Sequence, residues 1–157
     1  MRDKSQLRTE LHAQLVSALE TARAAHAAAI EGATHPEARA ENDKDTRGLE
    51  QSYLARGQAQ RVAELDAGVA DVAAMKLRVF SSDDPVAMSA LVVVREDGQD
   101  RSYFVAPSGG GNVLSGDVQV ITPVSPVGRA LLGKRVDDIA EVRAGGRVRE
   151  LELVSIC

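Results

Sequence analysis

The feature that most limits what this chain can fold into is an apolar repeat near its N-terminal end. From residue 5 to about residue 30, apolar side chains recur every three or four positions, and neither Gly nor Pro interrupts the run. This spacing predicts one long amphipathic helix, which Gly32 and Pro36 are expected to end. The repeat consists of Leu7, Leu11, Leu15, Leu19, Ala22, Ala25 and Ala29.

A second helical segment is predicted from about residue 46 to residue 75. Its glycines weaken a helix without ending it, each by about 1 kcal/mol relative to Ala. Two long helices joined by a turn predict an antiparallel coiled-coil hairpin, with residues 31–46 at its tip. The apolar line of the second helix is predicted to be Tyr53, Val62, Leu65, Val69 and Val72.

From residue 76 the period changes to that of short strands. β-branched and alternating segments are bounded by Gly, Pro and Asp, and irregular spacing in the last of them suggests a bulge or twist. Between the strands, "SPVGRALLGK" has the spacing of one short helix. The pattern predicts an α+β fold: a coiled-coil hairpin over residues 1–75, then an antiparallel β-domain with one short helix over 76–157. The predicted strands lie in "KLRVF", "MSALVVVRED", "RSYFVAP", "VQVITP", "IAEVRA" and "RVRELELVSI".

Composition excludes several classes of function. The formal net charge of −4 argues against a general grip on nucleic acid, and no sequence-specific DNA binding is expected. The single Cys157 and three well-separated histidines cannot form a zinc cluster. The glycine-rich "PSGGGNVLSG" lacks the Lys-Ser/Thr of a phosphate-binding loop and is expected to be a turn. No membrane-spanning run or signal sequence is evident, so a cytoplasmic location is expected.

Three carboxylates at the predicted tip raise a question of their own. Glu41, Asp43 and Asp45 lie within five positions, and Glu41 and Asp45 would share one face if a helix has begun there. In one interpretation they belong to a polar turn in which Asn42 or Asp45 caps the second helix. In the other, they supply ligands to a Mg²⁺ whose remaining ligands come from a partner, since this ion needs only one or two protein carboxylates. The isolated chain is expected to hold no metal.

Residues 120–156 resemble the C-terminal domain of the Gre-type transcript-cleavage factors of bacterial RNA polymerase. The resemblance rests on Ser125-Pro126, on "GRALLGK" from Gly128, and on the Asp137-Asp138 pair. It implies an FKBP-like β-domain that docks at the polymerase secondary channel while the coiled coil reaches down it. The docking residues carried over are Ser125, Pro126, Arg129 and Leu132. The alternative is that Ser125 only caps the short helix and the leucines pack on the sheet.

In the family, two acidic tip residues hold a Mg²⁺ shared with RNA polymerase and promote hydrolysis of backtracked RNA by the polymerase itself. Here Glu41 aligns with the first acid, but Lys44 stands at the place of the second. We therefore predict a monomeric, non-enzymatic factor that modulates transcription, most simply by obstructing the channel, without cleavage. The alternative is stimulated cleavage through Glu41 and Asp45, with Asp43 assisting.

Two further alternatives belong to other classes of protein. The FKBP-like fold allows a peptidyl-prolyl isomerase, but residues 76–157 contain only three aromatic side chains to line a proline pocket. The second alternative is a coiled-coil adaptor that dimerises through its alanine-rich first helix. The native mass distinguishes such a dimer from a monomer.

Overall fold

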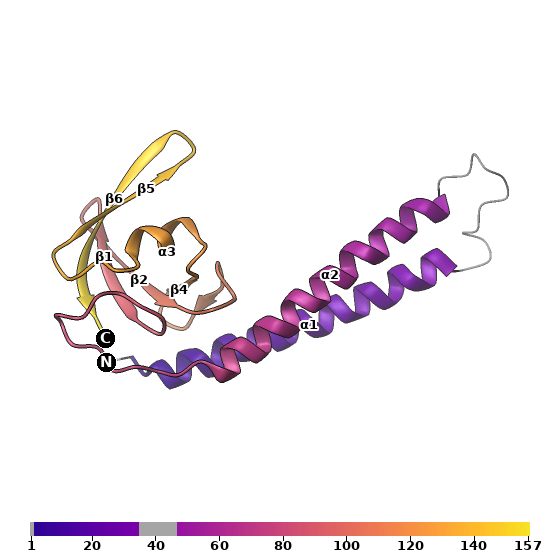
Figure 1. Cartoon of the computed structure of the whole chain (residues 1–157), viewed down its shortest axis with the longest axis horizontal. Coiled ribbons are helices and arrows are strands. Elements are labelled where there is room, and N and C mark those ends of the chain that lie inside the picture. The colour runs from indigo at the N-terminus through magenta and orange to yellow at the C-terminus, as the bar shows by residue number, and fades with distance from the viewer. Residues whose placement is uncertain (1, 35–46) are drawn as a thin grey trace. The chain divides into compact units, whose positions relative to one another are not determined.

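The computed structural model describes residues 2–34 and 47–157, and Figure 1 shows their helices and strands. The chain divides into two compact units, residues 1–12 with 70–157, and residues 13–69. The predicted division at residue 75 stays a prediction, because this grouping does not test which part folds independently. The elements are α1 (Lys4–Thr34), α2 (Arg47–Ala74), β1 (Leu91–Glu96), β2 (Gln99–Val105), β3 (Val113–Leu114), β4 (Val118–Ile121), α3 (Pro126–Leu131), β5 (Ile139–Ala144) and β6 (Arg147–Ile156).

The two long helices run antiparallel, as the repeat predicted. Arg8 of α1 donates a hydrogen bond of 2.8 Å to the carbonyl of Met75, directly after α2. Further along α1, Arg23 forms an ion pair of 3.5 Å with Asp66 of α2. Residue numbers thus rise along one helix as they fall along the other. Of the α1 repeat, all members are buried except Ala25, which is half-buried.

One residue assigned to the apolar line of α2 is misplaced. Tyr53 is 59% exposed, whereas Leu65 and Val72 are buried. Tyr53 and Val62 are nine residues apart, or two and a half helical turns, so their side chains lie on opposite sides of α2. The three- and four-residue steps that define the buried side begin only after Gly57.

The sheet has the strand order β3-β4-β2-β1-β6-β5. The pairs β1–β2, β1–β6, β3–β4 and β5–β6 are antiparallel, as predicted, but β2 and β4 are parallel. A parallel pair needs a crossover of about a dozen residues. Residues 106–117 supply it and include the short β3, which was not predicted within the glycine-rich stretch.

The predicted strand at residues 76–80 does not form. Its backbone groups bond to side chains instead of a neighbouring strand: the Arg78 N–H donates to Ser89 Oγ at 2.9 Å, and the Arg78 carbonyl accepts from the Lys4 ammonium. The predicted irregularity of the last strand is confirmed. Val93 lies opposite Ser155 and Val94 opposite Leu153, so Val154 is the extra residue of a bulge.

The main core lies between one face of the sheet and α3. Val92 and Val94 of β1, Leu151 and Leu153 of β6, and Leu131 of α3 are completely buried there. Alternate residues of a strand point to the same face, so the short apolar strands each supply two or three side chains to this core.

A charged cluster closes one end of this face. Glu96 of β1 is only 9% exposed and accepts two hydrogen bonds from Arg149 of β6, at 2.6 and 2.9 Å. Arg101 of β2 lies 3.2 Å from the same carboxylate. The hydrogen bonds from Arg149 hold the pKa of the Glu96 carboxyl below its usual value, and the nearby charges of Arg149 and Arg101 act in the same direction. Three neighbouring strands are thereby joined through one side chain.

We expect Glu96→Gln to lower the free energy of unfolding by about 2 kcal/mol at pH 7, because charge-assisted hydrogen bonds to Arg149 are lost. A lowered folded-state pKa means that Glu96 stabilises the fold above its unfolded-state pKa, and that this stabilisation is lost as the pH falls through the folded-state value. Urea unfolding at pH 7 and below pH 4 measures both effects.

Glu141→Gln is the matched control, since Glu141 is an exposed residue of β5. The role assigned to Glu96 would be wrong if both variants lost the same stability, or if the Glu96→Gln deficit were as large in acid as at pH 7.

Candidate docking surface

The segment that carries the family resemblance forms α3 and the turn before it. Ser125 is the N-cap residue, and its Oγ accepts a hydrogen bond of 3.1 Å from the Gly128 N–H. The same oxygen donates to the Thr122 carbonyl at 2.8 Å and accepts from the Thr122 N–H at 3.2 Å. Pro126 follows at the first helical position, where a missing N–H costs nothing. One hydroxyl therefore fixes both the turn and the start of the helix.

The inward side of α3 fits closely against the β-domain. Gly128 is buried, and a Cβ built on it would lie 1.8 Å from the Thr122 carbonyl oxygen. Leu131 is completely buried, and Leu132 is half-buried against the same core. The helix can approach the turn this closely only because residue 128 has no side chain.

The outward side of the same segment is open to solvent. Pro126 and Arg129 are exposed, and Val124 is 72% exposed. A valine this exposed gains nothing for the fold, whereas a buried contact with a partner would remove its apolar surface from water.

The four predicted docking residues thus divide into two kinds. Pro126 and Arg129 are available to a partner, while Ser125 and Leu132 are half-buried and engaged in the turn or the core. Their role in docking stays a prediction. Sequence reasoning missed Val124, whose only signal is an apolar residue between two prolines that fits neither the helical nor the strand period.

The predicted acidic tip residues Glu41, Asp43 and Asp45 lie outside the described residues. Among the residues that are described, no group of three or more His, Cys, Asp or Glu side chains could hold a metal ion. Near the described start of α2, Leu49 and Tyr53 are both more than half exposed, and the Arg56 guanidinium lies 5.6 Å from the Tyr53 ring centroid.

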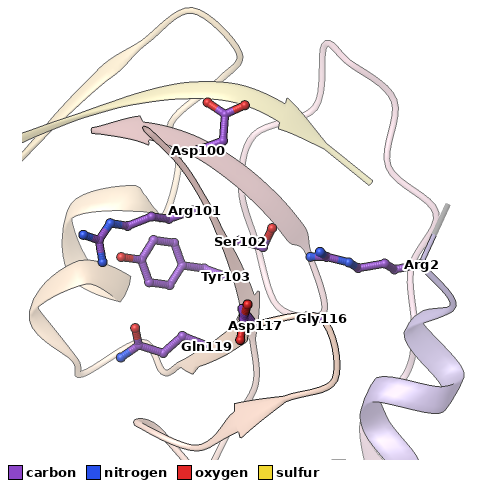
Figure 2. Close-up of a pocket in the computed structure, with 8 residues that line it drawn as sticks. All are labelled: Arg2, Asp100, Arg101, Ser102, Tyr103, Gly116, Asp117 and Gln119. Atoms are coloured by element: carbon purple, nitrogen blue, oxygen red, sulfur yellow. The ribbon is translucent and has the colours of Figure 1, made fainter. Parts of the chain in front are cut away.

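A polar pocket of about 330 Å³ lies between the start of α1 and strands β2 and β4 (Figure 2). Figure 2 shows Arg101, Tyr103 and Gln119 on one side of β2, and Arg2 on the other side near Gly116. Arg101 is paired with Glu96, and Tyr103 is a hydrogen-bond partner of Arg149. Arg101 and Tyr103 thus take part in contacts between strands. Together with Arg2 on the other side, they do not converge on one point where a substrate could react.

The aromatic side chains of the described β-domain do not gather around one pocket: Tyr103 lines the polar pocket above, and Phe80 lines a different groove. The three rings of the domain, Phe80, Tyr103 and Phe104, are all buried, with exposures of 7%, 2% and 0%. No pocket of the described residues is therefore seen to be lined by several aromatic side chains.

Comparison with known proteins bears on the family. Residues 81–157 match the family described as "Transcription elongation factor, GreA/GreB, C-term". The chain is 32% identical to transcription elongation factor GreA of Mesorhizobium japonicum over 97 residues, which cover 61% of this chain and 60% of that protein. GreA of Syntrophus aciditrophicus is 29% identical over 118 residues, or 74% of this chain and 69% of the relative.

Among solved structures, the crystal structure of GreA factor homolog 1 (Gfh1) of Thermus thermophilus is similar with a TM-score of 0.41 and 24% identity, over 93% of this chain and 94% of that one. The sheet and α3, residues 81–157, belong to the GreA/GreB family of transcription elongation factors. The Gre-type family predicted from the resemblance is confirmed. No described helix combines the length and the hydropathy needed to cross a membrane.

We expect Gly128→Ala to lower the free energy of unfolding by about 2–4 kcal/mol, because the added methyl group overlaps the Thr122 carbonyl and forces α3 to move. Urea unfolding measures this change. Gly57→Ala, in α2, is the matched control. Apart from the backbone of its own helix, no atom lies within 4 Å of the added Cβ, so we expect the free energy of unfolding to rise by about 0.5–1 kcal/mol. Equal effects at the two sites would contradict the close fit of α3.

Proposed function

We propose that this protein binds RNA polymerase at its secondary channel and modulates transcription without stimulating RNA cleavage. The observation that carries the proposal is the outward side of the α3 segment. Val124, Pro126 and Arg129 are exposed there, in the part of the chain that belongs to the GreA/GreB family. The relatives named above are transcription elongation factors, and a polymerase is the partner that such factors need.

The helical hairpin gives the proposal its mechanism. The 31 residues of α1, at 1.5 Å each, make a helix about 46 Å long, enough to reach into a channel. The apolar repeat of α1 is buried apart from Ala25, and Arg23 forms an ion pair with Asp66 of α2, so the hairpin carries its own stiffness. A factor of this kind acts by occupying space in the channel, and it works wherever its polymerase does, which in a bacterium is the cytoplasm.

The absence of cleavage follows from charge at the tip. Glu41 aligns with the first metal-directed acid of the family, but Lys44 takes the place of the second. Two-metal chemistry needs ligands that stabilise a cation, and an ammonium group beside them opposes it. The Mg²⁺ that a cleaving factor shares with the polymerase therefore has one aligned ligand here instead of two.

Binding is tested by titrating the full chain against purified bacterial RNA polymerase. We expect wild-type protein to bind as a monomer and Arg129→Glu to weaken binding by at least about tenfold, because an exposed arginine of the α3 segment is lost and its charge reversed. Pro126→Ala should also weaken it. Arg143→Glu, an exposed arginine of β5, is the matched control and should bind normally. Unchanged affinity for Arg129→Glu would remove the α3 segment from the docking surface.

Cleavage is tested on a backtracked elongation complex with Mg²⁺. We expect no more shortened RNA than the polymerase produces alone, together with slower transcription from an unarrested complex. If the wild-type protein accelerated shortening, and Glu41→Ala and Asp45→Ala abolished the acceleration, the alternative of Gre-type cleavage would replace this proposal.

A further inference from the structure

The segment between α2 and the first strand presents an unusually exposed apolar side chain. Val79 is 95% exposed, and the next most exposed large apolar side chain in the described residues is Val124, at 72%. Its neighbour Phe80 is only 7% exposed and belongs to the core of the β-domain. The chain therefore buries one residue and directs the adjacent one fully into solvent.

The backbone around Val79 is held on both sides. The Arg78 N–H donates to Ser89 Oγ at 2.9 Å, and the Lys4 ammonium donates to the Arg78 carbonyl and, at 3.1 Å, to the Ser89 carbonyl. Phe80 anchors the segment from the other side. Because these contacts fix the segment, a partner would find Val79 already in place, and little conformational entropy would be lost on binding.

Positive charge lies over the ring of the neighbouring Phe80. Lys4 Nζ lies 4.8 Å and the Arg78 guanidinium 4.7 Å from the centroid of the Phe80 ring. Both cations line a groove of about 510 Å³ together with Arg2, Leu77 and Val79.

The groove has little negative charge of its own. Its one acidic side chain, Asp3, accepts hydrogen bonds from the Ser5 N–H at 2.8 Å and the Ser5 hydroxyl at 2.7 Å at the start of α1. Cys157 also lines the groove and acts on Lys4 as a negative group. Three cationic side chains thus line the groove with two negative groups, Asp3 and Cys157, in a chain whose net charge is −4.

We propose that this groove is a second docking surface, which binds an acidic segment of RNA polymerase carrying an apolar side chain that covers Val79. The inference rests on the proposed function, because it takes the same partner. Charge complementarity identifies the occupant: a carboxylate would pair with Arg78, while the apolar contact desolvates Val79. Single-stranded nucleic acid fits less well, because it stacks on exposed aromatic rings, and the ring here is buried beneath its cations.

The test uses the full chain and purified RNA polymerase at two salt concentrations. We expect Val79→Ser to weaken binding by roughly five- to tenfold, as buried apolar surface is lost. Arg78→Glu should weaken it by at least about tenfold and reduce the dependence of affinity on salt. Val148→Ser and Arg143→Glu are the matched controls, since both residues are exposed on the β5–β6 hairpin and Val148 is 56% exposed. Both controls should bind like wild type.

The outcomes separate the two proposals. If Val79→Ser and Arg78→Glu bind as well as wild type while Arg129→Glu does not, the groove is not a docking surface and the proposed function stands. If wild-type protein does not bind the polymerase at all, both fail. If Val79→Ser and Arg78→Glu bind the polymerase normally but have a different native mass from wild type, the occupant is a second copy of this chain. If they bind the polymerase normally but lose affinity for single-stranded RNA, the occupant is a nucleic acid.

Discussion

The β-domain depends on the insertion of β6 between β1 and β5. The first part of this strand, residues 147–152, pairs with β5, and its last part, residues 152–156, pairs with β1. Its buried leucines belong to the same core as the valines of β1 and Leu131 of α3. Without it, β5 would have no neighbour in the sheet and the core face would be open. The Glu96–Arg149 pair joins β1 and β6 at the end of this face, where an unpaired carboxylate would be costly. Leu131 of α3 and Phe80, which hold the two proposed docking surfaces, belong to the core that this pairing completes.

The α3 segment has one side that packs on the sheet and one side that is open to a partner, and the two roles are compatible. Ser125, Gly128 and Leu131 hold the segment against the sheet through a cap, a close approach and a buried side chain. The same constraints leave Val124, Pro126 and Arg129 facing solvent. The predicted N-cap role of Ser125 is therefore confirmed, and it is compatible with docking by its neighbours. Val79 is exposed for a similar reason. Because Phe80 is fixed in the core, the preceding residue, Val79, points away from the core and into solvent.

Prediction succeeded wherever a local pattern had a single physical interpretation. An uninterrupted run of apolar residues at helical spacing predicts an amphipathic helix, and α1 and the later half of α2 follow from that. The strands β5 and β6 form at the predicted residues because Gly145-Gly146 permits a tight turn between two β-branched runs. Residues 76–80 have the same strand-like composition but remain outside the sheet. The carbonyl of Arg78 accepts a hydrogen bond from Lys4, which is distant in sequence, and not from a neighbouring strand. No local pattern contains that contact.

The amino-acid sequence by itself determined the two periods, the change between them near residue 76, the family to which residues 81–157 belong, and the Lys44 that departs from the family tip. These properties depend on neighbours along the chain or on residue identity alone. Only the tertiary structure decided that β2 and β4 are parallel, that Glu96 is enclosed by two arginines, and which residues near α3 and Phe80 face solvent. Burial and strand order depend on contacts between residues far apart in the chain, and a local pattern cannot specify which distant partner a side chain will meet.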